Sequence, residues 1–190
     1  MIKIYLKYLI FLTFLHCSFS FGIGNGSDEE EFTRSEILSI LALANSNRNI
    51  ILGSTRIFKS TVTSSINNTP LAISFDTSVY DTNNIFNLND PTKVTINRSG
   101  LYYIQGQLSY STNGTGIRKA NLVLNDLSVI GSTALPAASG DLTNISTEST
   151  YRLNVGDFLR LQGFQSSGGN LDIVVNSGYS QILSVTKLSE

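Results

Sequence analysis

Tryptophan is absent from this chain of 190 residues, and cysteine, histidine and methionine occur once each. The single cysteine, Cys17, and the single histidine, His16, both lie within the first twenty residues. The rest of the chain therefore forms no disulfide and offers no thiolate or imidazole for zinc binding, nucleophilic attack or general-base catalysis. A domain without disulfides must rely on a sizeable core or on oligomerisation for its stability.

Charge is also scarce. Asp, Glu, Lys and Arg make up 14% of the residues, and the formal net charge is −1. Because no basic surface is available to attract phosphate backbones, a nucleic-acid partner is not expected. Serine, threonine, asparagine and glycine are abundant instead, which is typical of a β-protein whose surface is hydrated by hydroxyls and amides.

The first twenty residues have the order of a secretory signal peptide. Lys3 and Lys7 precede an apolar run over residues 8–15, and small residues follow up to Ser20. The run is shorter than the roughly 20 residues of a membrane span. We therefore predict a signal peptide over 1–20, a secreted or cell-surface protein, and no membrane span in the mature chain. A retained N-terminal anchor and lipid modification at Cys17 are the alternatives.

Residues 21–55 are predicted to form a short helical stalk or linker. Ser27 and Glu30, like Thr33 and Glu36, have the spacing of a helix-capping box, and apolar residues then recur at helical spacing up to residue 44. A helix over 28–44 is too short to be stable alone. It either packs on its own domain or meets its copies as a stub of trimeric stalk.

From Arg56 onward the pattern is one of strands and turns. The stretch GLYYIQGQLSY at 100–110 places an apolar residue at every second position, as in a strand with one buried side. Similar short stretches recur to the end of the chain, and a long Ala/Gly/Ser-rich loop is expected over 132–140. RIFKSTVTS, at 56–64, is expected to be an edge strand. Eight to ten such strands imply an all-β sandwich or jelly roll.

Several of these stretches come in the order seen in one known family. They are AISFDTSVYDT (72–82), INRSGLYYIQGQLSY (96–110), GIRKANLVLN (116–125), YRLNVGDFLRLQ (151–162), QSSGGNLDI (165–173) and YSQILSVTKL (179–188). Gly100 would permit a tight approach at the start of its strand, and Gly156-Asp157 would make the turn that aims Leu159 and Leu161 inward.

With these motifs, residues 56–190 resemble the C1q/tumour necrosis factor domain in the divergent form found in bacteriophage and bacterial proteins. The resemblance implies a two-sheet antiparallel jelly-roll sandwich and a compact homotrimer. It also implies a non-enzymatic role, with binding to a partner or service in an extracellular or virion surface. The chain lacks the collagen-like stalk of the complement-type members.

Oxygen-rich side chains gather over residues 76–90. Asp76, Asp81, Asn83 and Asp90 are candidate calcium ligands, although the stretch lacks the glycine and terminal glutamate of an EF-hand loop. Asx turns explain such a composition equally well. No other metal, cofactor or catalytic residue is predicted. Four further carboxylates could supply a glycosidase pair only if two of them faced each other: Asp141, Glu148, Asp157 and Asp172.

The strands carry more aromatic residues than one two-layer core needs. Tyr102 shares the inward phase of Ile104, whereas Tyr103 and Phe158 fall on the opposite phase. We predict that Tyr102, Tyr103 and Phe158 line a homotrimer interface. A carbohydrate-stacking role is the alternative for the tyrosines at 102, 103, 110, 151 and 179. Five N-x-S/T sites, at Asn25, Asn67, Asn97, Asn113 and Asn144, matter only if the host glycosylates secreted proteins.

The function predicted from these observations is that of a secreted or surface-exposed trimeric binding protein. Loops at one end of the trimer would carry recognition of an extracellular protein or a glycan. A virion component, such as a fibre head or capsid decoration, is the first alternative. A carbohydrate-binding module is the second.

Overall fold

The computed structural model describes residues 38–39, 53–175 and 181–190. The chain divides into two compact units, 1–47 and 48–190. In the first, Leu38 and Ser39 are helical, while the rest of the predicted 28–44 helix, the signal peptide and Asn25 lie outside the described residues. No helix among the described residues has the length and hydrophobicity needed to cross a membrane.

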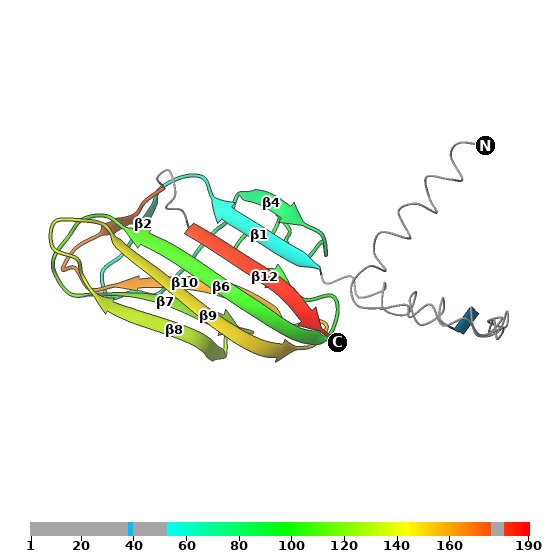
Figure 1. Ribbon diagram of the computed structural model, residues 1–190. Helices are drawn as coiled ribbons and strands as arrows, with labels where there is room; N and C mark the ends of the chain where they lie inside the picture. Colours follow the sequence, from blue (N-terminus) through cyan, green and yellow to red (C-terminus); the bar gives the residue numbers. More distant parts are fainter. Residues whose placement is uncertain (1–37, 40–52, 176–180) are drawn as a thin grey trace, which may run out of the picture. The chain divides into compact units, whose positions relative to one another are not determined.

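The second unit is built from antiparallel strands in two sheets (Figure 1). The strands are β1 (Ser54–Lys59), β2 (Thr63–Ser65), β3 (Leu71–Ala72), β4 (Thr77–Asp81), β5 (Val94–Thr95), β6 (Gly100–Tyr110), β7 (Ile117–Leu124), β8 (Ser128–Pro136), β9 (Thr143–Leu153), β10 (Phe158–Gln165), β11 (Leu171–Ile173) and β12 (Gln181–Ser189).

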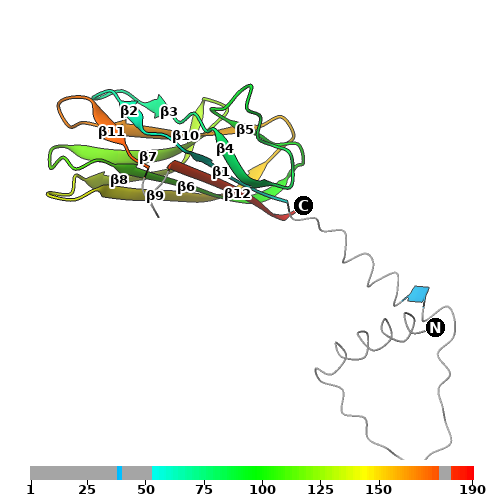
Figure 2. The same ribbon diagram turned by 90° about the horizontal axis from the view of Figure 1, so that it is seen from above.

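The seven-stranded sheet has the order β2-β11-β6-β12-β1-β4, with β9 paired to β6. The five-stranded sheet has the order β3-β10-β7-β8, with β5 paired to β10. Figure 2 shows the two layers edge-on. This arrangement confirms the all-β sandwich of jelly-roll type.

The core lies between the sheets and follows the alternation of the sequence. On β6 every second residue is buried, so that Tyr102, Ile104 and Leu108 point inward. They meet Leu159 and Leu161 of β10, which are fully buried as well. The preceding turn has Gly156 at φ 91°, and Asp157 Oδ2 accepts a 2.7 Å hydrogen bond from the Asn154 amide. The role predicted for the Gly-Asp turn is therefore confirmed.

Glycine is required where two backbones meet at the start of β6. A Cβ on Gly100 would lie 2.3 Å from the Ser189 carbonyl oxygen, closer than atoms can pack. Nearby, the Lys187 amide donates a 3.0 Å hydrogen bond to the Gly53 carbonyl. The first described residue of the sandwich, Gly53, and the end of β12 therefore lie at one pole.

Two predictions about local structure were wrong. Residues 132–140 are not a loop throughout, because β8 continues to Pro136 and pairs with β7 along its length. The stretch 56–64 is not one edge strand, because β1 lies between β12 and β4, and β2 pairs separately with β11. The strand β8 and the division of 56–64 into two strands were missed because small and hydroxylated residues in these stretches show no apolar alternation.

Candidate functional site

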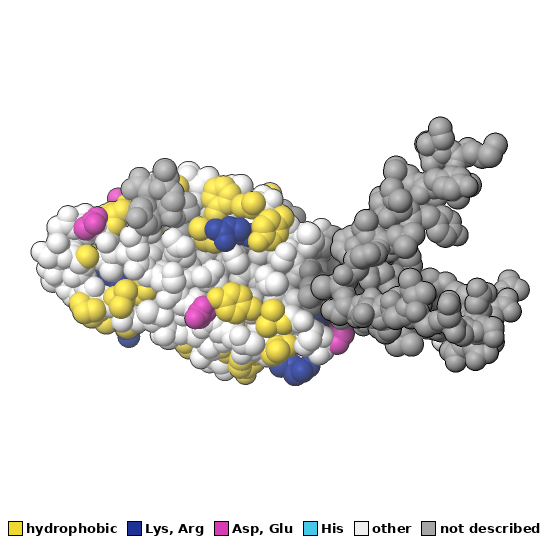
Figure 3. Space-filling view, in the orientation of Figure 1, with side chains coloured by type: hydrophobic (Ala, Val, Ile, Leu, Met, Phe, Trp, Pro, Cys, Tyr) yellow, Lys and Arg dark blue, Asp and Glu magenta, His cyan; other side chains and the backbone are white. Residues whose placement is uncertain are grey.

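Four neighbouring strands, β1, β12, β6 and β9, present one continuous outer face, which we call the assembly face (Figure 3). Residues that are paired across antiparallel strands point to the same side, so the side chains form rows. The middle row holds Arg56, Ser184, Gln105 and Glu148. The rows beside it are Phe58, Ile182, Gln107 and Ser146, and Ser54, Thr186, Tyr103 and Thr150.

Charge is rare on the assembly face. In its three rows Arg56 and Glu148 are the only charged side chains, and the remainder are hydroxyl, amide or apolar groups. Phe58, Ile182 and Tyr103 are all half-buried. Figure 3 shows a cation between hydrophobic side chains over β1 and β4, and a carboxylate beside a hydrophobic group over β6 and β9. Depletion of charge with aromatic enrichment is typical of the centre of a protein–protein interface.

Tyr103 and Glu148 are joined directly. The Tyr103 hydroxyl donates a 2.5 Å hydrogen bond to Glu148 Oε2. This bond to a carboxylate, with some desolvation, raises the pKa of Tyr103 above its ordinary value of 10.0. The bond also fixes the direction of the carboxylate on β9, which is an outer strand of its sheet. Tyr103 thus lies where the sequence predicted an outward aromatic residue.

Tyr102 lies elsewhere. Its side chain is fully buried in the core of the single chain, and its hydroxyl donates a 2.7 Å hydrogen bond to the Arg98 carbonyl. A side chain with no exposed surface cannot contact a second subunit. The expectation that Tyr102 lines an interface is therefore corrected, in agreement with the inward phase it shares with Ile104.

Phe158 points outward, as expected, but from the other sheet. It belongs to β10 of the five-stranded sheet, whereas Tyr103 belongs to β6 of the seven-stranded sheet. Lys93 Nζ lies 4.9 Å and Arg160 Cζ 5.3 Å from the Phe158 ring centroid. Two cations therefore cover this ring within the chain. Tyr103 and Phe158 lie on opposite faces of the sandwich and do not form one interface patch.

The calcium candidates do not converge. Asp81 accepts hydrogen bonds from the Thr55 hydroxyl and from the amides of Ile85 and Phe86, at 2.5, 3.1 and 2.9 Å. Asp76 binds Lys59 at 3.1 Å and the Ser60 amide at 2.8 Å. Among the described residues, no three His, Cys, Asp or Glu side chains are grouped so that they could hold a metal ion.

Of the other two calcium candidates, Asp90 is bound by a neighbour and Asn83 is enclosed by the fold. Asp90 lies 2.7 Å from Lys93 Nζ, and this bond lowers the pKa of Asp90 below its ordinary value. Asn83 is almost fully buried, and a Cβ on Gly53 would collide with it. The oxygen-rich stretch 76–90 therefore supports its own loop through side-chain-to-backbone bonds.

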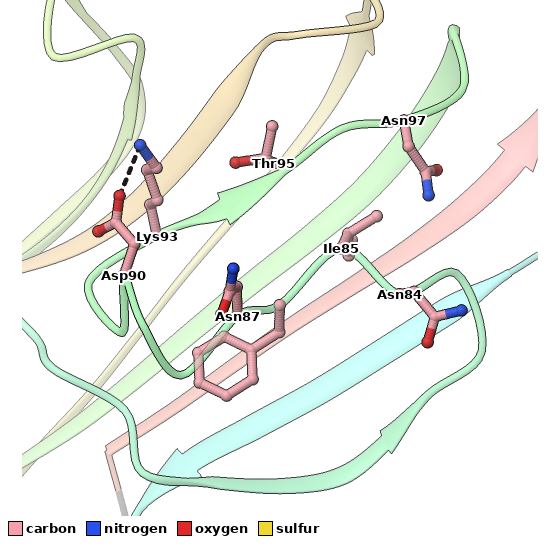
Figure 4. A pocket seen from close by; sticks show the side chains of 8 residues that line it. Asn84, Ile85, Asn87, Asp90, Lys93, Thr95 and Asn97 are labelled. Carbon is pink, nitrogen blue, oxygen red and sulfur yellow. Dashed lines mark ion pairs between the residues drawn. The ribbon is translucent and has the colours of Figure 1, made fainter.

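A pocket of about 420 Å³ is lined by the segment that follows β4 and by residues in and beside β5. Half of its lining residues carry an amide or a hydroxyl, and the others supply one aromatic ring, one isoleucine and one ion pair: Asn84, Ile85, Phe86, Asn87, Asp90, Lys93, Thr95 and Asn97. Figure 4 shows Asp90 and Lys93 at one end of the pocket and Asn84 and Asn97 at the other. The Asn97 amide donates a 2.5 Å hydrogen bond to the Asn83 carbonyl, which occupies one predicted glycosylation site. The sequence indicates only a possible calcium loop over residues 76–90, and it does not predict that the second half of this stretch lines a pocket together with residues 93–97.

The carboxylates considered for glycoside chemistry lie on different elements. Glu148 is on the assembly face, Asp157 holds the turn before β10, and Asp172 is exposed on β11. Asp141 accepts a 2.6 Å bond from the Leu142 amide in the loop before β9. Each carboxylate thus has its own local setting, and Glu148, Asp157 and Asp141 already accept hydrogen bonds from neighbours.

Solved structures share this arrangement of strands. Eiger TNF from S. frugiperda aligns with a TM-score of 0.56 at 12% identity, covering 73% of this chain and 94% of that chain. Murine APRIL aligns with a TM-score of 0.55 at 11% identity, covering 72% and 99%. The globular domain of zebrafish complement 1qA gives 0.52 at 11% identity, covering 73% and 98%. The described sandwich is a C1q/tumour necrosis factor-like jelly roll.

At 11 to 12% identity the likeness establishes the fold alone. No protein-family model matches the chain, and no curated protein matches it in sequence. The resemblance drawn from the motifs at 72–188 is confirmed at the level of this jelly roll. Its bacteriophage and bacterial form stays a prediction.

Proposed function

We propose that this chain is an exported, non-enzymatic, homotrimeric recognition head whose subunits meet through the assembly face. The observation that carries the proposal is the outer face of β1, β12, β6 and β9. It is nearly free of charge and holds three half-buried apolar or aromatic side chains: Phe58, Ile182 and Tyr103. Burying one such side chain is worth about 1.5–3 kcal/mol, and a closed ring repeats each contact in every subunit.

The oligomer is tested with a face variant and a matched control. Ile182→Asp places a charge in the centre of the assembly face, while Leu127→Asp places one in the β7–β8 turn, where Leu127 is 89% exposed. Light scattering of the mature chain should give a trimer for wild type and Leu127→Asp and a monomer for Ile182→Asp. Circular dichroism checks that each variant folds; if Ile182→Asp does not, Tyr103→Ser replaces it. A wild-type protein that is monomeric at micromolar concentration would contradict the proposal.

Export rests on the N-terminal pattern, and the non-enzymatic role on the lack of histidine and cysteine after residue 17. N-terminal sequencing of the natively expressed protein should find Phe21 or a close neighbour first. A chain that still begins at Met1 would contradict secretion and would favour the virion alternative, because virion parts of phage type assemble in the cytoplasm. Genes for phage morphogenesis beside this one would favour it as well.

We propose carbohydrate recognition as a second candidate function, because the pocket beside β5 combines an aromatic ring with amides. Saccharide-binding sites commonly combine these groups, since the face of an aromatic ring packs on the C–H groups of a sugar and amides form hydrogen bonds with its hydroxyls. Thr95→Lys would fill the pocket from an exposed position without disturbing the core. Ala134→Lys, on an exposed outward position of β8, is the control. A glycan-array signal lost in the first variant and kept in the second supports this function; no signal with wild type contradicts it.

A further inference from the structure

The middle row of the assembly face carries opposite charges at its two sides. Arg56 lies on β1 and Glu148 on β9, and the register places Ser184 and Gln105 between them. Arg56 donates a 3.1 Å hydrogen bond to the Ser184 hydroxyl, and Glu148 accepts the bond from Tyr103. Neither side chain forms an ion pair in the part of the chain that the structure describes.

These two charges do not pair within the chain that the structure describes, because each side chain is engaged by a nearer neighbour. Neighbouring strands lie about 4.8 Å apart, so three strand spacings separate the two backbones by roughly 14 Å. An ion pair needs its nitrogen and oxygen within about 4 Å. Each protomer therefore offers a cation at one side of its assembly face and a carboxylate at the other, both already oriented by a neutral neighbour.

The strand that carries Glu148 is the last strand of its sheet, and β8 of the other sheet lies beside it: a Cβ on Gly131 would come within 2.8 Å of the Glu148 carbonyl oxygen. Among the described strands β9 pairs only with β6, although it runs for 11 residues, Thr143–Leu153. It contains neither lysine nor proline, and its charged side chains are Glu148 and Arg152. Arg56, by contrast, lies on a strand with a neighbour on either side, β12 and β4, and is paired in register with Tyr80.

We propose that the β9 edge of one protomer packs on the β1 side of the next, so that Glu148 binds Arg56 of the following copy. This inference rests on the proposed homotrimer and specifies its contact. A head-to-tail contact joins two different patches and closes into a ring when the rotation allows it. One other feature favours the same contact: the pair forms in a surrounding with no competing charge, because Arg56 and Glu148 are the only charged side chains in the three rows.

A charge-reversal cycle on the mature chain tests the pairing. Arg56→Glu and Glu148→Arg should each weaken the trimer by roughly thirtyfold or more, because like charges then face each other in a desolvated contact. The double variant should return to within about threefold of wild type. Lys119→Glu, on an outward position of β7 in the other sheet, is the control and should leave the trimer unchanged.

Mixing the two single variants distinguishes a ring of three from a two-fold dimer. In a dimer, one copy of each variant satisfies every pair. In a ring of three, one contact must join two like copies, so the mixture recovers only part of the wild-type affinity. Full recovery, with the mass of a dimer in analytical ultracentrifugation, would overturn the head-to-tail arrangement.

The outcomes separate this inference from the proposed function. A trimer that tolerates both charge reversals contradicts the Arg56–Glu148 contact and leaves the assembly face in place. A wild-type monomer contradicts both. If a reversal prevents folding, Arg56→Gln and Glu148→Gln provide the same cycle, and additive effects of the two changes would overturn the contact.

Discussion

The Arg118 guanidinium carbon lies 5.9 Å from the centroid of the Tyr110 ring, and both side chains are fully buried. Arg118 donates hydrogen bonds to three carbonyl oxygens, those of Asn113, Thr115 and Ile117, at 2.8 to 3.1 Å. Burial lowers the pKa of Arg118 and raises that of Tyr110. A cation without an anion in the described residues thus ties the β6–β7 connection to the core.

Arg118→Lys should therefore destabilise the domain by about 2–4 kcal/mol, since an ammonium cannot reach the three carbonyls in this planar arrangement. Urea unfolding followed by circular dichroism measures the loss. Arg98→Lys, at an exposed position, is the control and should stay within about 0.5 kcal/mol of wild type. An equal effect at both positions would show that the carbonyl contacts contribute nothing.

The pH dependence of stability should contain a contribution from Asp76. Burial alone would raise its pKa, but hydrogen bonds from Ser60, Thr77 and Lys59 outweigh this and hold it below its ordinary value of 3.8. A carboxyl whose pKa is lower in the folded state stabilises the fold above the unfolded value, and that stability is lost as the pH falls through the folded value. Asp76→Asn should be less stable than wild type at neutral pH, and the difference should shrink below pH 3.8. Urea unfolding at a series of pH values checks it; a constant difference would contradict the linkage.

Gly106 is a site where added volume should be costly. A Cβ there would lie 2.4 Å from the Leu161 Cδ1 atom in the closed core. We expect Gly106→Ala to lower the free energy of unfolding by about 1–3 kcal/mol. Gly169→Ala is the control, because nothing lies within 4 Å of its Cβ position, and that variant should be neutral or slightly stabilised. Thermal melts of the two variants decide between the expectations.

Calcium should have little effect on stability. Asp81 and Asp76 already accept hydrogen bonds from several neighbours, so a cation would have to displace protein donors to reach them. We expect the melting temperature to differ by less than about 2 °C between EDTA and millimolar calcium. A fall of more than about 10 °C in EDTA would mean several kcal/mol of bound-metal stabilisation and would restore the calcium site.

Alternation along a strand predicts which residues point inward, and the buried positions of β6 and β10 follow it closely. It does not say which of two sheets a strand joins. Tyr103 and Phe158 have the same outward phase and therefore looked alike, although they lie on opposite faces. The register that aligns Arg56 with Glu148 is equally hidden, because it depends on three strand pairings whose partner residues lie 43, 79 and 128 positions apart in the sequence.

The meeting of Gly53 and Lys187 at one pole has a practical consequence. A protein fused to either end of the sandwich is attached at the same pole, and the opposite pole stays free. The loop at Gly168-Gly169 joins β10 to β11, and nothing lies within 4 Å of either Cβ position. This loop is therefore a suitable place to insert a peptide. Because the two ends of the sandwich are adjacent, we expect a circular permutant that joins them and begins at this loop to keep the same two sheets.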